Sequence, residues 1–597
     1  MASAYALAHL KSTIPLAVLL TLISCLILNR THLLKVAAVV LTIFSAALTW
    51  NVYLINAGIW TYPPQAITGA RLMGIPVAEL FVFFVQTYIT SLIYIFCNIT
   101  VVHAKYLKTQ WNPPTWIRQT KLAVQVYLAA LTVLSARALH RGDRSGYMSS
   151  IITWIAPIAL SIWTVAGRFI LSLPGSGTVV PILISTAYQL LFDGLESGKG
   201  TWTIGNESKL RLYLFGSLEI EDAYFFLCTN MLVVFGLAAV DQYLAVIDAF
   251  PHLFPEAPTV PTLRMLLKVF FTGTKEYDTE RIQGIWEADD RLRAKSRSFH
   301  LASFAFSGRM RIDLILLYSF CRMADDLIDN ATSEEEIKSW SSKLIRYFDL
   351  FYDGNDVHRR EVDWVKVNRL VDTEFPASAR SALRFLPTRI LPGRPFYGLI
   401  EGFRMDAQFN IAQKDDPSAR FPIKDEAALW KYSNCVAGTI GQLCNALIVH
   451  HCRYAPPNHI QYQLGLTAMS MGIALQLVNI ARDIPTDAKM GRVYLPTTWL
   501  RDRGLTPEDI IKHPDGETIR QLRQRVLNTA FTIYGEMRPV MEHLPNEARG
   551  PMILVVESYM EIGRVLRESY GWTMEQGKAT VPARRRLMMA VKTLLSS

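Results

Sequence analysis

Long apolar segments are concentrated in the first 250 residues, whereas the rest of the chain shows the apolar and polar periodicity of amphipathic helices. A helix needs roughly 20 apolar residues to cross a bilayer. Because the sixth apolar segment is short, the pattern predicts a bundle of six to seven membrane-spanning helices. The segments are Leu10–Leu28, Val36–Ile55, Ile75–Val102, Leu122–Leu139, Ile151–Leu171, Val179–Phe192 and Ala223–Ile247.

The composition agrees with a membrane part joined to a second domain. The chain has 597 residues, too many for one core, and its mean hydropathy of +0.20 with 19% charged residues is unusual for a soluble protein. The net charge of +10 suits a membrane surface or an anionic substrate, and no basic-aromatic motif favours nucleic acid. The seven cysteines form no CxxC, so we expect neither a zinc site nor a disulfide framework, and a reducing compartment.

A proline-rich stretch separates the two parts. Four prolines between Phe250 and Pro261 exclude a regular helix and predict a stiff linker, followed by a short amphipathic segment over 262–280. We therefore expect a membrane domain at 1–250, a linker at 251–280 and an all-α domain at 281–597. The basic loop residues favour an orientation with the last domain in the cytosol, which predicts a multi-pass protein of an endomembrane.

Two acidic pairs with the same spacing lie in the second half. Asp325 and Asp329 form one pair, and Asp483 and Asp487 form the other. At i, i+4 on a helix the two carboxylates share one face. Each pair lies beside an apolar run, where uncompensated carboxylates are costly, and an arginine precedes it. Two such helices facing each other would hold Mg²⁺ (or Mn²⁺) and a diphosphate.

The membrane part contains a weak internal repeat. The segment 76–87 resembles 219–230, and each follows a loop with a tryptophan and a glycine. Each copy places carboxylates at the start of an apolar helix: Glu79 in the first, Glu221 and Asp222 in the second. Acids inside a membrane are expensive and usually functional. Two parallel three-span units require an odd number of spans between them, which the segment 122–139 would supply.

Motifs in both halves of the chain resemble those of known protein families. Most of residues 281–597 resembles the phytoene/squalene synthases, and the N-terminal half is similar to the small membrane lycopene cyclases. In that order the two halves resemble the fungal bifunctional lycopene cyclase/phytoene synthases. In the cyclase repeat, Ala78 and Glu219 depart from the usual Pro-x-Glu-Glu. The synthase resemblance rests on Ser296–His300, Cys321–Asp329, Gly402–Asp406, Tyr432–Gly441, Gln476–Asp487 and Gly491–Pro496.

The resemblance implies an isoprenoid-synthase fold that joins two geranylgeranyl diphosphates head to head into phytoene. The four aspartates would bind the metal, with Asn479 and Gln476 orienting the second pair. Tyr432 and Tyr494 would face the cation or its diphosphate, although either tyrosine could equally be a core aromatic. The small residues Val436–Gly438 and Gly441 would admit a prenyl chain or allow close helix packing. The arginines expected to bind diphosphate are Arg297, Arg322, Arg482 and Arg492.

For the membrane half, the resemblance implies proton-initiated cyclisation of lycopene, with Glu79, Glu221 and Asp222 as acid and base. No cofactor is evident for this redox-neutral step. Partners would be the lipid bilayer and a desaturase acting between the two reactions. A squalene-type synthase with a purely anchoring N-terminal half stays open as an alternative. A rhodopsin-like receptor is disfavoured, because Ala223–Ile247 contains no lysine for a retinal Schiff base.

Overall fold

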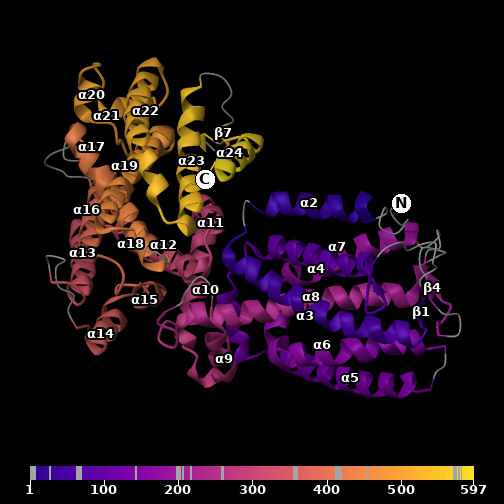
Figure 1. The fold of residues 1–597 in the computed structure, drawn as a ribbon. Helices are drawn as coiled ribbons and strands as arrows, with labels where there is room; N and C mark the ends of the chain where they lie inside the picture. Colours follow the sequence, from indigo (N-terminus) through magenta and orange to yellow (C-terminus); the bar gives the residue numbers. More distant parts are fainter. Residues whose placement is uncertain are drawn as a thin grey trace. The chain divides into compact units, whose positions relative to one another are not determined.

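The computed structural model divides the chain into two compact units, residues 1–282 and 283–597 (Figure 1). In both units helices dominate, which confirms the all-α prediction. The strands among the described residues are two residues long and pair only in twos. The structure describes residues 9–25, 28–61, 70–141, 144–196, 203–204, 208–214, 218–256, 261–353, 361–409, 420–452, 456–568, 574–575, 578–579 and 581–596.

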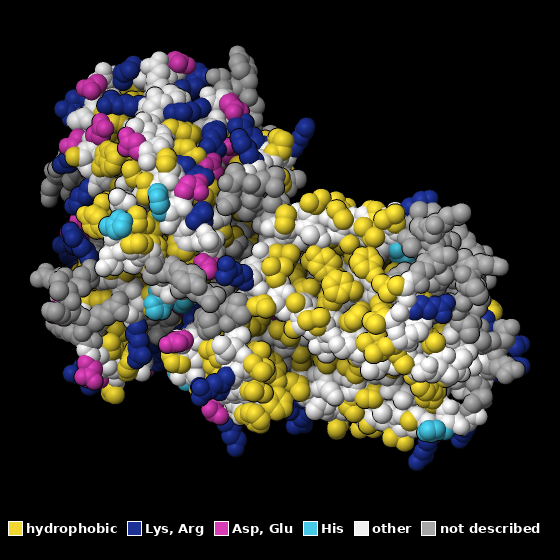
Figure 2. Space-filling model, in the orientation of Figure 1, with side chains coloured by type: hydrophobic (Ala, Val, Ile, Leu, Met, Phe, Trp, Pro, Cys, Tyr) yellow, Lys and Arg dark blue, Asp and Glu magenta, His cyan; other side chains and the backbone are white. Residues whose placement is uncertain are grey.

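The first unit is a bundle of long apolar helices with short polar connections. Figure 2 shows apolar side chains spread over its surface, and exposed residues such as Leu122, Val126 and Leu183 belong to that surface. Exposed apolar side chains over several helices are expected where lipid is the solvent. The helices are α2 (Thr13–Ser24), α3 (Arg30–Asn56), α4 (Val77–Asn98), η1 (His103–Gln110), α5 (Thr115–Leu139), α6 (Gly146–Ser172), α7 (Gly175–Glu196), α8 (Ile220–Ala249), α9 (Leu263–Phe271) and η3 (Thr274–Glu276).

Six helices of this unit, α3 to α8, are long and apolar enough to cross a membrane. The apolar helix before them covers only His9–Ser24, so among the described residues the short member is the first segment and not the sixth. The sixth segment is extended by a turn on each side, because α7 runs from Gly175 to Glu196 and contains Pro181. Helix α19 of the second unit also meets the length and hydropathy criteria, although more than half of its most apolar window is buried inside its own unit.

Two hairpin–helix units give the internal repeat a structural form. Strands β2 (Arg71–Leu72) and β3 (Ile75–Pro76) pair just before α4, and β5 (Tyr213–Leu214) and β6 (Leu218–Glu219) pair just before α8. The two tryptophan loops also meet, because β1 (Trp60–Thr61) pairs antiparallel with β4 (Thr203–Ile204). Helix α5 lies between the helices of the two copies in the sequence, as the predicted joint does. The hairpins therefore set the start of α4 and of α8, where the predicted acids stand.

A buried ion pair ties the other end of the bundle. The Lys35 ammonium on α3 lies 2.8 Å from Oδ1 of Asp241 near the end of α8, and both side chains are buried. Tyr94 on α4 donates a 2.8 Å hydrogen bond to the same carboxylate. A buried carboxylate needs such partners to stay charged. The network fixes α3 and α4 against α8 at the end away from the predicted acids.

The second unit surrounds two hydrophobic cores. One is built mainly on α19 and the helices after it, and the other packs α12 to α16 around Phe320, Phe348 and Phe396. The helices are α10 (Thr279–Lys295), α11 (Arg297–Ser303), α12 (Gly308–Asp329), α13 (Glu334–Asp349), α14 (Trp364–Glu374), α15 (Ala377–Arg384), α16 (Arg394–Gln408), α17 (Glu426–Ser433), η5 (Asn434–Gly438), α18 (Thr439–His451), α19 (Asn458–Lys489), α20 (Thr497–Arg501), α21 (Pro507–Lys512), α22 (Glu517–Met537), η6 (Pro539–His543), α23 (Asn546–Arg567) and α24 (Ala583–Ser596), with the strand pair β7 (Met574–Glu575) and β8 (Lys578–Ala579).

Glycines allow the helix backbones at the centre of this unit to touch. A Cβ added at Gly441 would lie 2.1 Å from the carbonyl oxygen of Ala468, and one at Gly472 would lie 2.4 Å from that of Ala437. Real side chains do not tolerate such distances. At Gly441, the two interpretations of the small residues are thus resolved in favour of close helix packing. The contact holds η5 and α18 against α19, the helix that carries the second acidic pair.

Candidate active sites

The acidic pairs of the second unit occupy the last turns of α12 and α19. Helix α19 is followed by Gly491 at φ +73°, a left-handed conformation that favours glycine, and the Arg492 amide donates a 2.9 Å hydrogen bond to the Asp487 carbonyl. This reversal brings the Arg492 side chain against Asp329 at the end of α12, where the two form an ion pair. One arginine therefore joins the ends of the two acidic helices.

Other arginines pair with the remaining acids. Arg322 lies 3.0 Å from Oδ2 of Asp325 and also pairs with Asp326. The Nε of Arg482 donates a 2.9 Å hydrogen bond to Oδ1 of Asp483. Three of the four predicted arginines thus stand beside the predicted aspartates. The fourth, Arg297, begins α11, and its side chain lies outside the described residues.

Asp406 on α16 is a carboxylate to which the motif gave no role. The Tyr432 hydroxyl donates to its Oδ1 at 2.8 Å, and the Tyr494 hydroxyl donates to the same oxygen at 2.7 Å. The two tyrosine rings stack with centroids 5.1 Å apart. Burial raises the pKa of Asp406 to about 6, and the two hydroxyls and the nearby Arg492 oppose that rise. Both predicted tyrosines therefore donate hydrogen bonds to one carboxylate.

Asp325, at the end of α12, lies among both carboxylates and cations, and Lys295 pairs with the neighbouring Asp326 at 3.4 Å. Burial raises the pKa of Asp325 to about 7; Arg322 opposes the rise, while the carboxylates of Asp406 and Asp329 add to it. A bound cation would relieve this repulsion and keep all of these groups ionised. The site thus has the electrostatic character of a binding site for metal ions.

The donor set also fits a hard divalent ion. The side-chain oxygen of Asn479, one turn before Asp483, is buried and accepts no hydrogen bond from the described residues. Its amide group lies 3.4 Å from Oε1 of Gln476. Within the described ranges, no three or more His, Cys, Asp and Glu side chains could hold an ion by themselves. Mg²⁺ commonly binds through one or two carboxylates together with water and substrate phosphates, so these pairs suit it.

A second cluster of acids lines a hollow in the first unit. Glu79 at the start of α4, Asp222 at the start of α8 and Asp193 near the end of α7 all contribute to its wall, and all three are buried. Tyr147 on α6 donates a 2.8 Å hydrogen bond to Oδ1 of Asp222. The predicted acids of the two repeat copies, Glu79 and Asp222, therefore meet in one place.

Glu221 does not line this hollow, although it precedes Asp222 directly. Neighbouring positions on a helix point about 100° apart. The Glu221 carboxylate instead accepts a 2.6 Å hydrogen bond from the Leu210 amide, and its side chain is fully buried. In this structure Glu221 fixes the chain that leads into the second hairpin. Its predicted role as a catalytic acid stays a prediction.

Aromatic rings form much of the remaining wall. Trp60, Phe83 and Phe225 line the hollow together with Phe192 and Phe226. Trp50 contacts both Trp154 and Phe225, with ring centroids 4.9 and 5.1 Å away, and the latter two rings also contact each other at 6.2 Å. The faces of aromatic rings attract cations. A hollow with carboxyl groups and aromatic walls could therefore both start and stabilise a carbocation.

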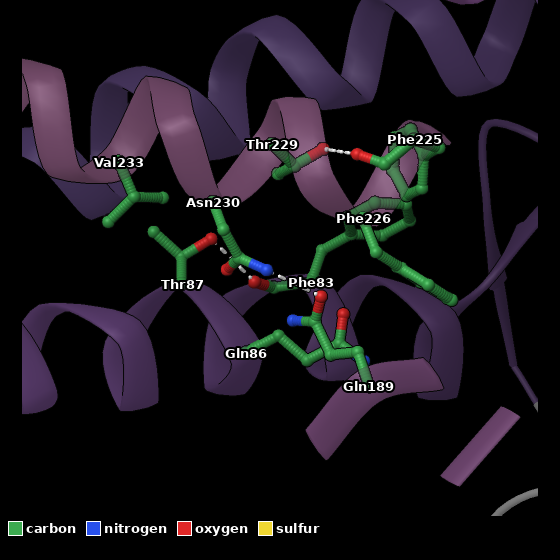
Figure 3. Close-up of a pocket in the computed structure, with 9 residues that line it drawn as sticks. All are labelled: Phe83, Gln86, Thr87, Gln189, Phe225, Phe226, Thr229, Asn230 and Val233. Carbon is green, nitrogen blue, oxygen red and sulfur yellow. Dashed lines mark hydrogen bonds between the residues drawn. The ribbon is translucent and has the colours of Figure 1, made fainter. Parts of the chain in front are cut away.

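Polar side chains of α4, α7 and α8 line a second hollow (Figure 3). This second hollow shares Phe83, Gln86 and Phe225 with the first. Asn230 lies between the helices: its amide donates to Gln189 at 2.9 Å, and its oxygen accepts from Thr90 at 2.8 Å. Such fully paired polar groups can be buried among apolar helices. They hold α4, α7 and α8 in a fixed relation under the acid cluster.

Sequence reasoning missed two of these carboxylates. Asp406 stood inside a quoted motif but has no partner at i+4, so its spacing gave no signal. Asp193 had a signal in the repeat: it lies nine positions before Trp202, and Asn51 lies nine positions before Trp60. The first copy thus has an amide, Asn51, where the second has an acid, Asp193, so comparing the two copies did not reveal a shared carboxylate.

Comparison with known proteins places the chain among carotenoid enzymes. The squalene/phytoene synthase family model matches residues 292–585. A bifunctional lycopene cyclase/phytoene synthase of Podospora anserina is 53% identical over 100% of both chains, and one of Neurospora crassa is 50% identical over 99% of both. Among solved structures, a dehydrosqualene synthase aligns with 53% of this chain and 96% of its own, at 20% identity and a TM-score of 0.40.

Proposed function

We propose that each unit of this chain, which belongs to the family of bifunctional lycopene cyclase/phytoene synthases, catalyses one of two reactions in carotenoid synthesis. The second unit joins two geranylgeranyl diphosphates into phytoene. The first unit closes rings at the ends of lycopene, giving γ- or β-carotene. The observation that carries the proposal is that each unit holds a carboxylate cluster of its own, buried in the first unit and partly buried in the second, with no residue shared between the two.

In the second unit, ionisation of the diphosphate ester is the demanding step. Mg²⁺ or Mn²⁺ bound by Asp325, Asp329, Asp483 and Asp487 would neutralise charge on the leaving diphosphate. Arg322, Arg482 and Arg492 can bind the diphosphate oxygens through forked N–H donors. Arg297 is proposed for the same task. The ion pairs that these arginines make with the aspartates support this assignment, because they keep the guanidinium groups beside the metal ligands.

Asp406 orients two tyrosine side chains in the second unit. Its carboxylate fixes the hydroxyls of Tyr432 and Tyr494 and faces Arg492. The tyrosine rings lie next to the acidic end of α12 and can face an allylic cation. Asn479 and Gln476, one and two turns before Asp483 on α19, would orient the second metal-binding pair.

In the first unit, one carboxylic acid protonates a terminal double bond and a carboxylate removes a proton from the ring cation. Glu79 and Asp222 are the proposed pair. Asp222 suits the base, because Tyr147 donates a hydrogen bond to its oxygen and so fixes the orientation of the carboxyl group in the hollow. The aromatic wall around Phe225 would stabilise the positive charge between the two proton transfers. No cofactor is needed for this balance.

The environment of the two reactions follows from their substrates. Lycopene is soluble only in a bilayer, so the first unit would take it from the lipid of an endomembrane. Geranylgeranyl diphosphate and Mg²⁺ are water-soluble, so the second unit would face the cytosol. A desaturase on another chain would convert the product of the second unit into the substrate of the first. The linker proposed at 251–280 falls within the bounds of the first compact unit, and its residues 257–260 lie outside the described ranges.

Pigment analysis of a carotenoid-free host tests both activities with the full chain. One background supplies geranylgeranyl diphosphate, and the other makes lycopene. We expect phytoene in the first and γ- or β-carotene in the second. Phytoene with unchanged lycopene would reduce the first unit to an anchor, as in the squalene-type alternative, and squalene in place of phytoene would support that alternative directly.

A further inference from the structure

Ring closure in the first hollow moves a proton from the donor acid to the acceptor base, so neither group is ready for a second reaction. For each ring, the donor acid loses a proton to a double bond, a carbon–carbon bond closes the ring, and the base takes a proton from a ring carbon. The product is an isomer of the substrate, so no proton is gained or lost overall. After one ring the proposed donor Glu79 is ionised and the proposed acceptor Asp222 is protonated. A second ring requires the proton to move back.

Asp193 lies where such a return would pass. It comes from α7, whereas Glu79 comes from α4 and Asp222 from α8, and the three line the same hollow. The Asp193 carboxyl interacts electrostatically with Glu79, and Asp222 interacts electrostatically with Asp193. Its side chain is 3% exposed, so water has little access to it from outside the protein.

The hydrogen bonding of Asp193 is incomplete. Its Oδ2 is buried and has no hydrogen-bond partner among the described residues. A buried carboxyl oxygen without a partner is costly, and a structural carboxylate would be expected to have donors around it. Tyr147 supplies such a donor to Asp222 but not to Asp193. Because Asp193 also lines the hollow, its unpartnered oxygen is placed to take up and release a proton there.

We propose that Asp193 returns the proton from Asp222 to Glu79 after each ring closure. This inference rests on the proposed cyclase function of the first unit. Asp193 takes the proton from the protonated Asp222, directly or through a water in the hollow, and passes it to the ionised Glu79. No other reactant is required, because the same proton resets both groups. In this proposal Asp193 transfers a proton between the two reacting carboxyl groups and does not itself contact the polyene.

The internal repeat indicates why the relay is present once. Asn51 holds the position equivalent to Asp193 in the first copy, is fully buried, and donates from its amide to the Ala47 carbonyl at 2.9 Å. An amide cannot carry a proton between carboxylates. The bundle therefore has two similar halves but one relay, beside the one hollow where Glu79 and Asp222 meet.

The test separates the first ring from the later ones. The purified full chain in lipid discs is mixed with lycopene, in excess of enzyme and below it, and rings formed per enzyme are followed in time. We expect wild type to form rings at a steady rate. Asp193→Asn should form about one ring per enzyme at nearly the wild-type rate and then turn over at least 10-fold more slowly. Asp193→Glu, which restores a carboxyl group, should recover part of the steady rate.

Two controls keep the outcomes apart. Phytoene formation by the same preparations reports folding of the chain, and Asp248→Asn, the same change at the far end of α8, should behave as wild type. Loss of the first ring in Asp193→Asn, or an unchanged steady rate, would overturn the relay. If wild type closes no rings, or if Glu79→Gln and Asp222→Asn close them normally, the proposed cyclase function itself fails.

Discussion

The Tyr147 hydroxyl donates a 2.8 Å hydrogen bond to Oδ1 of Asp222, and both side chains are buried at the start of α6 and α8. The bond fixes the direction of the carboxylate that we propose as the base of ring closure. It also joins α6, which belongs to the same repeat copy as α8, to the hollow. A single O–H group thus sets the orientation of the reacting group.

Tyr147→Phe should slow ring closure and leave phytoene formation unchanged. A hydrogen bond to a charged group contributes roughly 1.5–3 kcal/mol, so the rate of ring closure should fall on the order of 10- to 100-fold. Initial rates with lycopene in lipid discs measure the effect. A matched control is Tyr94→Phe, which removes a bond of equal length to Asp241 at the other end of the bundle. It should lower thermal stability but not the rate per folded enzyme; equal rate losses in both variants would contradict the assignment.

The acidic limb of phytoene formation should depend on the two tyrosines that bind Asp406. Their hydrogen bonds oppose the effect of burial, which holds the pKa of Asp406 at about 6. Activity that needs the ionised carboxylate is present above that pKa and is lost as the pH falls through it. Removing one hydroxyl, as in Tyr494→Phe, should raise the pKa of Asp406 by about one to two units, so the loss should begin at a higher pH.

Rates of phytoene formation from pH 5 to 9 measure this shift. Tyr432→Phe should move the limb in the same direction, and the double variant should lose more than the product of the single losses, because Asp406 then has neither donor. Tyr462→Phe, the same change at a ring that is 70% exposed on α19, serves as the control. An acidic limb that stays in place in both single variants would show that Asp406 is not the titrating group.

Removal of divalent ions should separate the two activities. Chelation with EDTA should stop phytoene formation and leave ring closure intact, because the acids of the first unit carry out proton transfer without a metal. Asp325→Ala and Asp483→Ala should each reduce phytoene formation by several orders of magnitude. Asp290→Ala, an exposed aspartate of α10 in the same unit, should have no effect. Retained synthesis in the two site variants would remove the metal assignment.

The spacing of residues predicted those features that depend on one helix or on a repeated segment. Asp325 with Asp329, and Asp483 with Asp487, share a helix face because of the period of the helix itself. Glu79 and Asp222 were found because the repeat copies place them at the same point. Ion pairs between elements, such as Arg492 with Asp329, depend on a turn at Gly491 that no local pattern specifies.

Other features required the packed structure. Asp193 and Asp406 become site residues only when α7 or α16 is placed against its neighbours. Glu221 and Asp222 are adjacent in the sequence, and only the fold decides that one binds a backbone amide while the other faces the hollow. The tight contact at Gly472 could not be predicted either, because the sequence around a helical glycine does not identify the backbone that packs against it.

Gly472→Ala should destabilise the second unit, because the added methyl group would lie 2.4 Å from the backbone oxygen of Ala437 in η5. Backbone cannot move aside as a side chain can, so overpacking should cost about 1–3 kcal/mol or more. Gly465→Ala is the matched control on the same helix, since nothing lies within 4 Å of its added Cβ. At Gly465 the change should stabilise the second unit by up to about 1 kcal/mol, because alanine favours a helix.

Heating the full chain and assaying both activities gives the measurement. Phytoene formation should be lost at a lower temperature in Gly472→Ala and not in Gly465→Ala, while loss of ring closure stays at the wild-type temperature in both. Equal inactivation of the two variants would show that α19 can move away from η5 without penalty.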